Sequence, residues 1–133
     1  GLFYWRGDTL FATISYYNIG GGILGGLLAA AFGLIDWLGI PAGTRAKRIG
    51  LFHGVTNVLV VLLFSAAWLA RTALPNFEPT TFVMAVEVAA IVLALVAGWL
   101  GGELVDRLGV GVDEGANVNA PNSLSGKPAS GRV

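Results

Sequence analysis

Three long apolar stretches, separated by short polar segments, dominate the pattern of hydrophobic and polar positions along the chain. They cover residues 12–38, 49–70 and 81–105. At a rise of about 1.5 Å per residue, each is long enough for an α-helix to cross the hydrocarbon core of a bilayer. The pattern therefore predicts an all-α integral membrane protein, a bundle of three transmembrane helices.

The end of the chain has a different composition. Residues 109–133 are rich in Gly, Asn, Ser and Pro, and they lack the periodicity of a helix. Such a segment cannot bury enough apolar surface to fold alone. We therefore predict two parts, a transmembrane domain over residues 1–108 and a polar, extended, irregular tail over residues 109–133.

The composition supports a membrane location and excludes several kinds of chemistry. Hydrophobic residues make up 55% of the chain and charged residues only 12%, whereas soluble domains are about 25% charged. The formal net charge of zero gives no reason to expect nucleic-acid binding. The chain has no cysteine, which excludes disulfides, thiol nucleophiles and cysteine-ligated metal clusters.

Small residues recur at intervals of four in the first apolar stretch, so that they share one face of a helix. In a membrane such a face lets a second helix approach closely. We therefore predict that these residues form helix-packing surfaces. The first stretch contributes Gly21, Gly25, Ala29 and Gly33, with Gly22, Gly26 and Ala30 beside them, and the third contributes Gly98, Gly101 and Gly102.

Five polar residues fall near one boundary of the membrane. Asp36 ends the first span, Arg48 begins the second, His53 and Asn57 follow one turn apart, and Glu103 ends the third. We expect them to form one polar cluster. It is either a hydrogen-bonded clamp between helix ends, which we favour, or a proton relay, a haem-ligating histidine, or a quinone or ligand site. We expect no metal site, because further ligands at suitable spacing are not visible.

One carboxyl group lies within the opposite half of the membrane. Glu87 is about two turns into the third span, and a charged group at that depth is costly. We expect it to be protonated, or to pair with Asn18 or with a side chain of a partner protein. Arg71 is interpreted as a basic residue that bounds the second span.

Basic residues near the helix ends predict the orientation. The loop after the first span and the tail together carry six: Arg45, Lys47, Arg48, Arg107, Lys127 and Arg132. The opposite side carries Arg6 and Arg71. We therefore expect the first loop and the C-terminal tail to face the cytoplasm.

Several short motifs, in this order, resemble a known family. They are GLIDW at residues 33–37, Arg48 with His53 and Asn57, SAAWLAR at residues 65–71, and GWLGGELVDRLGVGV at residues 98–112. The sequence is similar over residues 16–112 to the bacterial predicted membrane proteins of DUF2231, some of which are fused to a Rieske iron–sulfur domain. The resemblance implies four spans, the first with a histidine–proline motif, so we expect this chain to carry the last three helices of a four-helix bundle.

For function, we expect a non-catalytic accessory subunit of a larger membrane complex in the bacterial inner membrane, such as an electron-transfer or photosynthetic complex. The expected partners are other membrane subunits and lipids, and we expect no resident cofactor. The alternative is a redox or ligand-binding protein in which His53 holds haem b or faces a quinone. The third candidate is a proton or solute carrier that uses Asp36, His53, Glu87 and Glu103.

Overall fold

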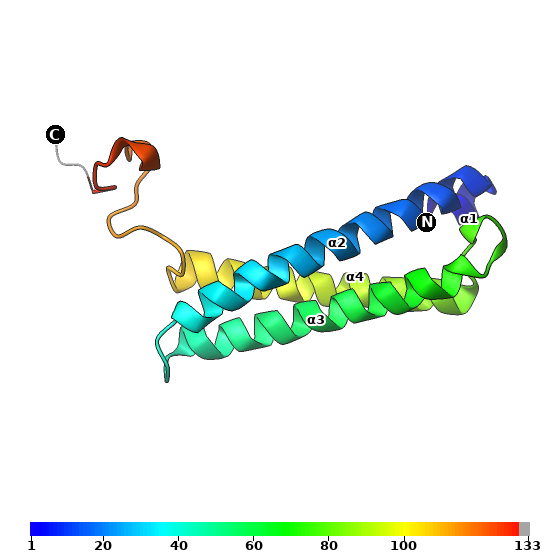
Figure 1. Cartoon of the computed structure of the whole chain (residues 1–133), viewed down its shortest axis with the longest axis horizontal. Coiled ribbons are helices and arrows are strands. Elements are labelled where there is room, and N and C mark those ends of the chain that lie inside the picture. Colours follow the sequence, from blue (N-terminus) through cyan, green and yellow to red (C-terminus); the bar gives the residue numbers. More distant parts are fainter. Residues whose placement is uncertain (131–133) are drawn as a thin grey trace.

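The computed structural model describes residues 1–130, and three long helices run side by side in it (Figure 1). They are α2 (Thr9–Gly39), α3 (Arg45–Thr72) and α4 (Thr81–Gly102). The shorter elements are α1 (Leu2–Arg6), the 3₁₀ turns η1 (Pro75–Phe77) and η3 (Ser123–Ser125), and the π-helical turn η2 (Glu103–Arg107), which continues α4.

Each long helix begins at a side chain that caps its free backbone N–H groups. The side-chain oxygens of Asp8, Thr44 and Thr80 accept hydrogen bonds from backbone N–H groups two or three residues further on, at 2.9–3.3 Å. Such caps satisfy donors that have no acceptor within the helix. The three caps fix where α2, α3 and α4 start.

All three helices are long and apolar enough to cross a membrane. Their large side chains point mainly away from the bundle, as Leu28, Leu62 and Leu95 do, each more than half exposed. A soluble protein rarely exposes so much contiguous apolar surface, and in lipid the same surface is at no disadvantage. The predicted fold class, a helical membrane protein with three spanning helices, is confirmed.

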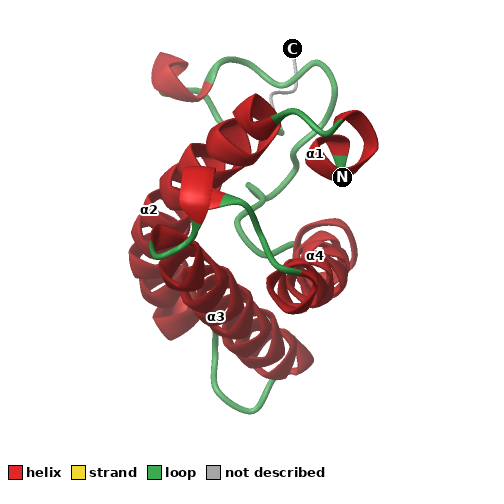
Figure 2. Ribbon diagram, turned by 90° about the vertical axis from the view of Figure 1, so that its right-hand side faces the viewer, coloured by secondary structure: helices red, strands yellow, loops and turns green. Residues whose placement is uncertain are grey.

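Helix α3 lies between the other two helices and packs against both (Figure 2). Direct packing between α2 and α4 is minor in the described part of the chain. The residues of α3 that face its neighbours recur with alternating steps of three and four, as in a coiled-coil seam. They are Gly50, His53, Asn57, Val60, Phe64, Ala67 and Arg71.

Small side chains dominate the seam between α3 and α4. Helix α4 and the turn after it bury Val83, Ala90, Ala97 and Leu104, which are seven residues apart. Ala90 is fully buried and Ala97 is 2% exposed. Lipid supplies no hydrophobic force between helices, so close approach through small residues is the main source of packing energy. A seven-residue repeat is typical of helices that cross at a small angle.

The described tail leaves the bundle after η2 and contains turns and η3 (Figure 1). Its side-chain contacts are local, such as the bond from Asn117 Nδ2 to the Ala129 carbonyl at 2.9 Å. Arg132, one of the six basic residues from which the orientation is predicted, lies outside the described residues.

Replacing Ala90 by Leu should overfill the seam between α3 and α4 and lower the free energy of unfolding by about 1–3 kcal/mol. Ala89 is the matched control, because it is the neighbouring alanine and is exposed. Thermal unfolding in detergent micelles measures both variants. Equal stability of Ala90→Leu and Ala89→Leu would contradict the described seam.

Candidate functional site: two polar clusters between the helices

A buried arginine connects the three helices at the end of the bundle where α2 starts. The guanidinium of Arg71 is fully buried. Its Nη1 donates to Glu87 Oε1 on α4 at 2.8 Å, and its Nη2 donates to the Ala12 carbonyl and to Ser15 Oγ on α2 at 2.7 and 2.8 Å. Its Nε donates to the Phe77 carbonyl at 2.8 Å. These bonds and the ion pair compensate the cost of removing the charge from water.

Aromatic rings cover the same arginine. Tyr16 stacks on Phe77 with ring centroids 4.0 Å apart and on Trp68 with centroids 5.1 Å apart. The Arg71 guanidinium carbon lies 5.9 Å from the centre of the Tyr16 ring, within reach of a cation–π interaction. We call Arg71, Glu87, Ser15, Tyr16 and Phe77 the Arg71 cluster.

The turn after α3 is bent to meet this cluster. Asn76 and Phe77 have φ values of 49° and 55°, in the left-handed region that side chains disfavour. Such residues cost on the order of 1–3 kcal/mol and persist where the surroundings hold them. Here the hydrogen bond from Arg71 to the Phe77 carbonyl and the stacking of Phe77 on Tyr16 stabilise the left-handed conformation.

The structure corrects the interpretation of Glu87. Its partner is Arg71 of the same chain, at 2.8 Å, rather than Asn18, which is exposed on α2. Arg71 does not bound the second span as an exposed interfacial residue, because it is buried between the helices. The signal for this role was present in the sequence, since Arg71 continues the three-four spacing that passes through His53 and Asn57.

The second cluster joins α3 to α4 nearer the other end of the bundle. His53 Nδ1 lies 2.9 Å from the Ala97 carbonyl, and Asn57 Nδ2 lies 3.1 Å from His53 Nε2. A carbonyl can only accept, so Nδ1 donates to it and Nε2 accepts from the amide. The same Asn57 nitrogen also donates to the His53 carbonyl at 2.9 Å. Both ring nitrogens of His53 are therefore engaged within the chain.

The other members of the expected five-residue cluster lie apart from this pair. Glu103 forms an ion pair with Arg45 at 2.6 Å, and the side chain of that arginine is 53% exposed. Arg48 is exposed, and Asp36 is exposed in the wall of a cleft that it shares with His53. Within the described residues, neither takes part in an ion pair. The arrangement is a histidine–asparagine pair and a separate ion pair.

Sequence reasoning missed a clamp between α2 and α3. Trp37 Nε1 donates to the Lys47 carbonyl at 3.0 Å, and Lys47 Nζ donates to the Trp37 carbonyl at 2.6 Å. The ammonium also lies 4.0 Å from the centre of the Trp37 ring. Gly50 makes room for that ring, because a Cβ there would lie 2.8 Å from Trp37 Cδ1. The signal in the sequence for this clamp is that Trp37 and Lys47 are ten residues apart, on either side of the turn between α2 and α3.

The predicted packing glycines divide into three groups by what surrounds the Cβ position. A Cβ at Gly26 would lie 3.0 Å from Val61, and one at Gly101 would lie 3.1 Å from His53, so both lie in the seams. Gly102 is near only a side chain of its own helix end. The others have open space at the Cβ position, and Ala29 and Ala30 are exposed with them. This open group is Gly21, Gly22, Gly25, Gly33 and Gly98.

Gly20, which the sequence interpretation did not select, is also used for close packing. A Cβ at this position would lie 3.0 Å from Trp68 Nε1. That indole nitrogen is buried and has no hydrogen-bond partner among the described residues. Gly20 therefore lets α2 approach the Trp68 ring of α3.

The polar atoms of these clusters are already hydrogen-bonded within the chain, which limits the chemistry that they can perform. The described residues contain no group of three or more His, Cys, Asp or Glu side chains placed to hold a metal ion. Arg71 and His53 direct their polar atoms to partners in neighbouring helices. The geometry suits cross-linking of the helices.

Three apolar helices joined by buried polar clusters define a multi-pass helical membrane protein. A model of the family of predicted membrane proteins DUF2231 matches residues 2–114, and the chain belongs to this family. The recognition made from the motifs is confirmed. No curated protein and no solved structure matches the chain.

Replacing Arg71 by Leu should lower the free energy of unfolding by about 3–5 kcal/mol, because Glu87 is left without its partner at membrane depth. The double variant Arg71→Leu with Glu87→Leu should recover part of that loss, since no uncompensated charge remains. Thermal unfolding in detergent measures both. Additive losses in the double variant would show that the pair is not coupled.

Replacing His53 by Ala should lower the free energy of unfolding by about 1–3 kcal/mol, because the Ala97 carbonyl and the Asn57 amide lose partners. Thr56→Ala serves as a control, because Thr56 bonds only its own helix, at the Phe52 carbonyl. If His53→Ala melts like the wild type, the pair does not tie α3 to α4.

Proposed function

We propose that this chain is a non-catalytic accessory subunit that packs against the helices of a larger membrane protein complex. The surface that receives the partner is the outward face of α2 formed by Gly21, Gly25, Ala29 and Gly33, which we call the glycine face. The polar clusters hold the three helices together and keep this face presented.

The observation that supports the proposal is a contrast between two sets of small residues. One set contacts a neighbouring helix of this chain, and the other set contacts none. Where helices of this chain meet, small residues such as Gly26 and Gly101 are in tight contact. The glycine face has the same residue types at four-residue spacing, and a Cβ at Gly21, Gly25 or Gly33 would meet open space. Each glycine lowers the stability of a helix by about 1 kcal/mol relative to alanine. Close packing of another helix against the glycine face would offset this cost, whereas contact with lipid alone would not.

The polar side chains support a structural role. Arg71 and Glu87 bond each other across α3 and α4, and His53 bonds Asn57 and the Ala97 carbonyl. A side chain that holds a proton path or a ligand needs an atom free to exchange partners. The internal bonds therefore favour the accessory-subunit proposal.

The alternative, in which His53 binds haem b or a quinone, requires that one ring nitrogen of His53 is free to contact that ligand. A haem ligand uses a ring nitrogen for the iron, and His53 Nε2 lies 3.1 Å from Asn57 Nδ2 while Nδ1 lies 2.9 Å from the Ala97 carbonyl. Either use would break a bond between or within the helices. No observation favours this candidate over the packing subunit.

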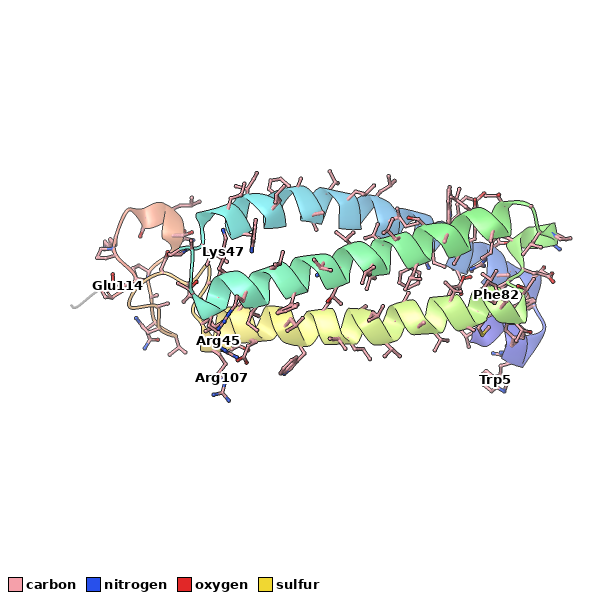
Figure 3. All side chains as sticks on the ribbon, turned by 90° about the horizontal axis from the view of Figure 1, so that it is seen from below. Trp5, Arg45, Lys47, Phe82, Arg107 and Glu114 are labelled. Atoms are coloured by element: carbon pink, nitrogen blue, oxygen red, sulfur yellow. The ribbon has the colours of Figure 1, made fainter. Side chains whose placement is uncertain are left out.

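We further propose the bacterial inner membrane as the location, with the end that carries Arg45, Lys47 and Arg107 in the cytoplasm. Figure 3 shows these three residues at the same end of the bundle, opposite Trp5 and Phe82. Because Arg71 is buried, Arg6 is the one exposed basic side chain at that opposite end in the described part of the chain. The charge asymmetry that predicts orientation is therefore larger than the sequence count.

The test is replacement of Gly25 by Ile followed by affinity purification from membranes in mild detergent. The chain should keep its own stability, since a Cβ at this position meets nothing within 4 Å, but it should lose stoichiometric partner proteins. Leu28→Ile is the control, because it changes an exposed apolar residue of the same helix without filling the glycine face. A wild-type chain that purifies as a homogeneous monomer would refute the proposal.

A further inference from the structure

An open hollow lies between the ends of the three long helices at the basic end. It is an open cleft of about 1150 Å³. Its walls come from the end of α2, the start of α3, and η2 with the residues after it. The apolar part of the wall includes Ile35, Ile40, Leu104, Val105 and Leu108. Because α2 and α4 scarcely touch, this side of α3 stays uncovered.

The rim of the cleft is polar and includes one cation. Arg45, at the start of α3, lines the cleft and pairs with Glu103 while its side chain stays 53% exposed. The backbone N–H groups of Arg45 and Ala46 have no acceptor within the helix, because they lie in its first turn, and the cap Thr44 Oγ1 accepts from Lys47 instead. The start of a helix also favours negative charge.

The other ionisable groups that face the cleft do not reverse this preference. His53 has both ring nitrogens bonded within the chain. Asp36 is the one carboxylate in the wall, and Lys47, which is bonded to neighbouring carbonyls outside the wall, adds a positive charge in the first turn of α3 beside Arg45. Arg48 adds a further exposed positive charge one residue after Lys47.

We propose that this cleft binds an anionic phospholipid. The acyl chains lie against the apolar wall, and the phosphate lies at the rim, where it accepts from Arg45 and from the free N–H groups at the start of α3. Arg45 in the wall, with Lys47 and Arg48 in the same helical turn, and the apolar residues of the wall match the two halves of such a molecule. The proposal does not depend on the accessory-subunit function, although Gly33 belongs both to the glycine face and to the wall of this cleft.

Tryptophan fluorescence offers a direct test, because Trp37 lines the cleft and Trp99 does not. Trp99 is 68% exposed on α4 and lies near the same end of the bundle, so it serves as the reference for bulk lipid. Two variants each keep one of these tryptophans and have Phe at the remaining tryptophan positions. They are reconstituted in phosphatidylcholine vesicles with a minor fraction of phosphatidylglycerol, and either lipid carries brominated acyl chains as the quencher.

Brominated phosphatidylglycerol should quench Trp37 as if its local mole fraction were about five-fold above bulk, the enrichment expected from one basic side chain near an anionic lipid. Trp99 should report the bulk fraction. Brominated phosphatidylcholine should show no enrichment at Trp37. Equal quenching of Trp37 by the two lipids, relative to Trp99, would overturn the proposal.

Three further substitutions separate the phosphate contact from an effect on the fold. Arg45→Gln should abolish the enrichment, and Arg48→Gln, which removes the same charge outside the cleft wall, should retain most of it. Glu103→Gln breaks the same ion pair but frees Arg45, so the enrichment should persist or rise. If Glu103→Gln abolishes it as Arg45→Gln does, the ion pair shapes the cleft and the proposed contact is wrong. Added inorganic phosphate should leave the enrichment unchanged, and its displacement of the lipid would identify a phosphate site instead.

Discussion

The need to surround one buried charge determines how the three helices meet. Arg71 lies inside the bundle with no exposed surface, in a region where a bare guanidinium would be very costly. Its partners come from α2 and from α4, two helices that otherwise scarcely touch. A single side chain of α3 therefore sets the spacing of both neighbours, and it also holds the strained turn at Phe77.

The opposite end of the bundle is held differently, and the difference explains its shape. There the helices are joined in pairs, α2 to α3 by Trp37 and Lys47 and α3 to α4 by His53. Among the described residues at that end, no side chain of α3 bonds to both α2 and α4, as Arg71 does at the other end. The bundle is consequently closed at one end and open at the other, where the large cleft lies.

The sequence predicted the spans, the membrane class and the family, because length and apolar composition are sufficient for a bilayer. It predicted Gly26 and Gly101 as packing residues but could not separate them from Gly21 or Gly25, since the face of a helix that meets a neighbour depends on tertiary packing. The role of Arg71 was missed because its position at the end of an apolar run matched an interfacial residue. Its spacing from His53 and Asn57 would have placed it in the seam.

The distribution of polar bonds bears on where any function must reside. Apart from the indole N–H of Trp68, the polar side chains buried in the seams already have partners, and removing those partners would cost stability before it gained reactivity. Two other unsatisfied features lie on the surfaces of the helices: the glycines on α2 that no helix of this chain covers, and the free backbone donors at Arg45. Both features are complementary to other components of a membrane, the first to a helix and the second to an anion. The internal polar network is therefore best understood as the framework that presents these two surfaces at fixed positions in the bilayer.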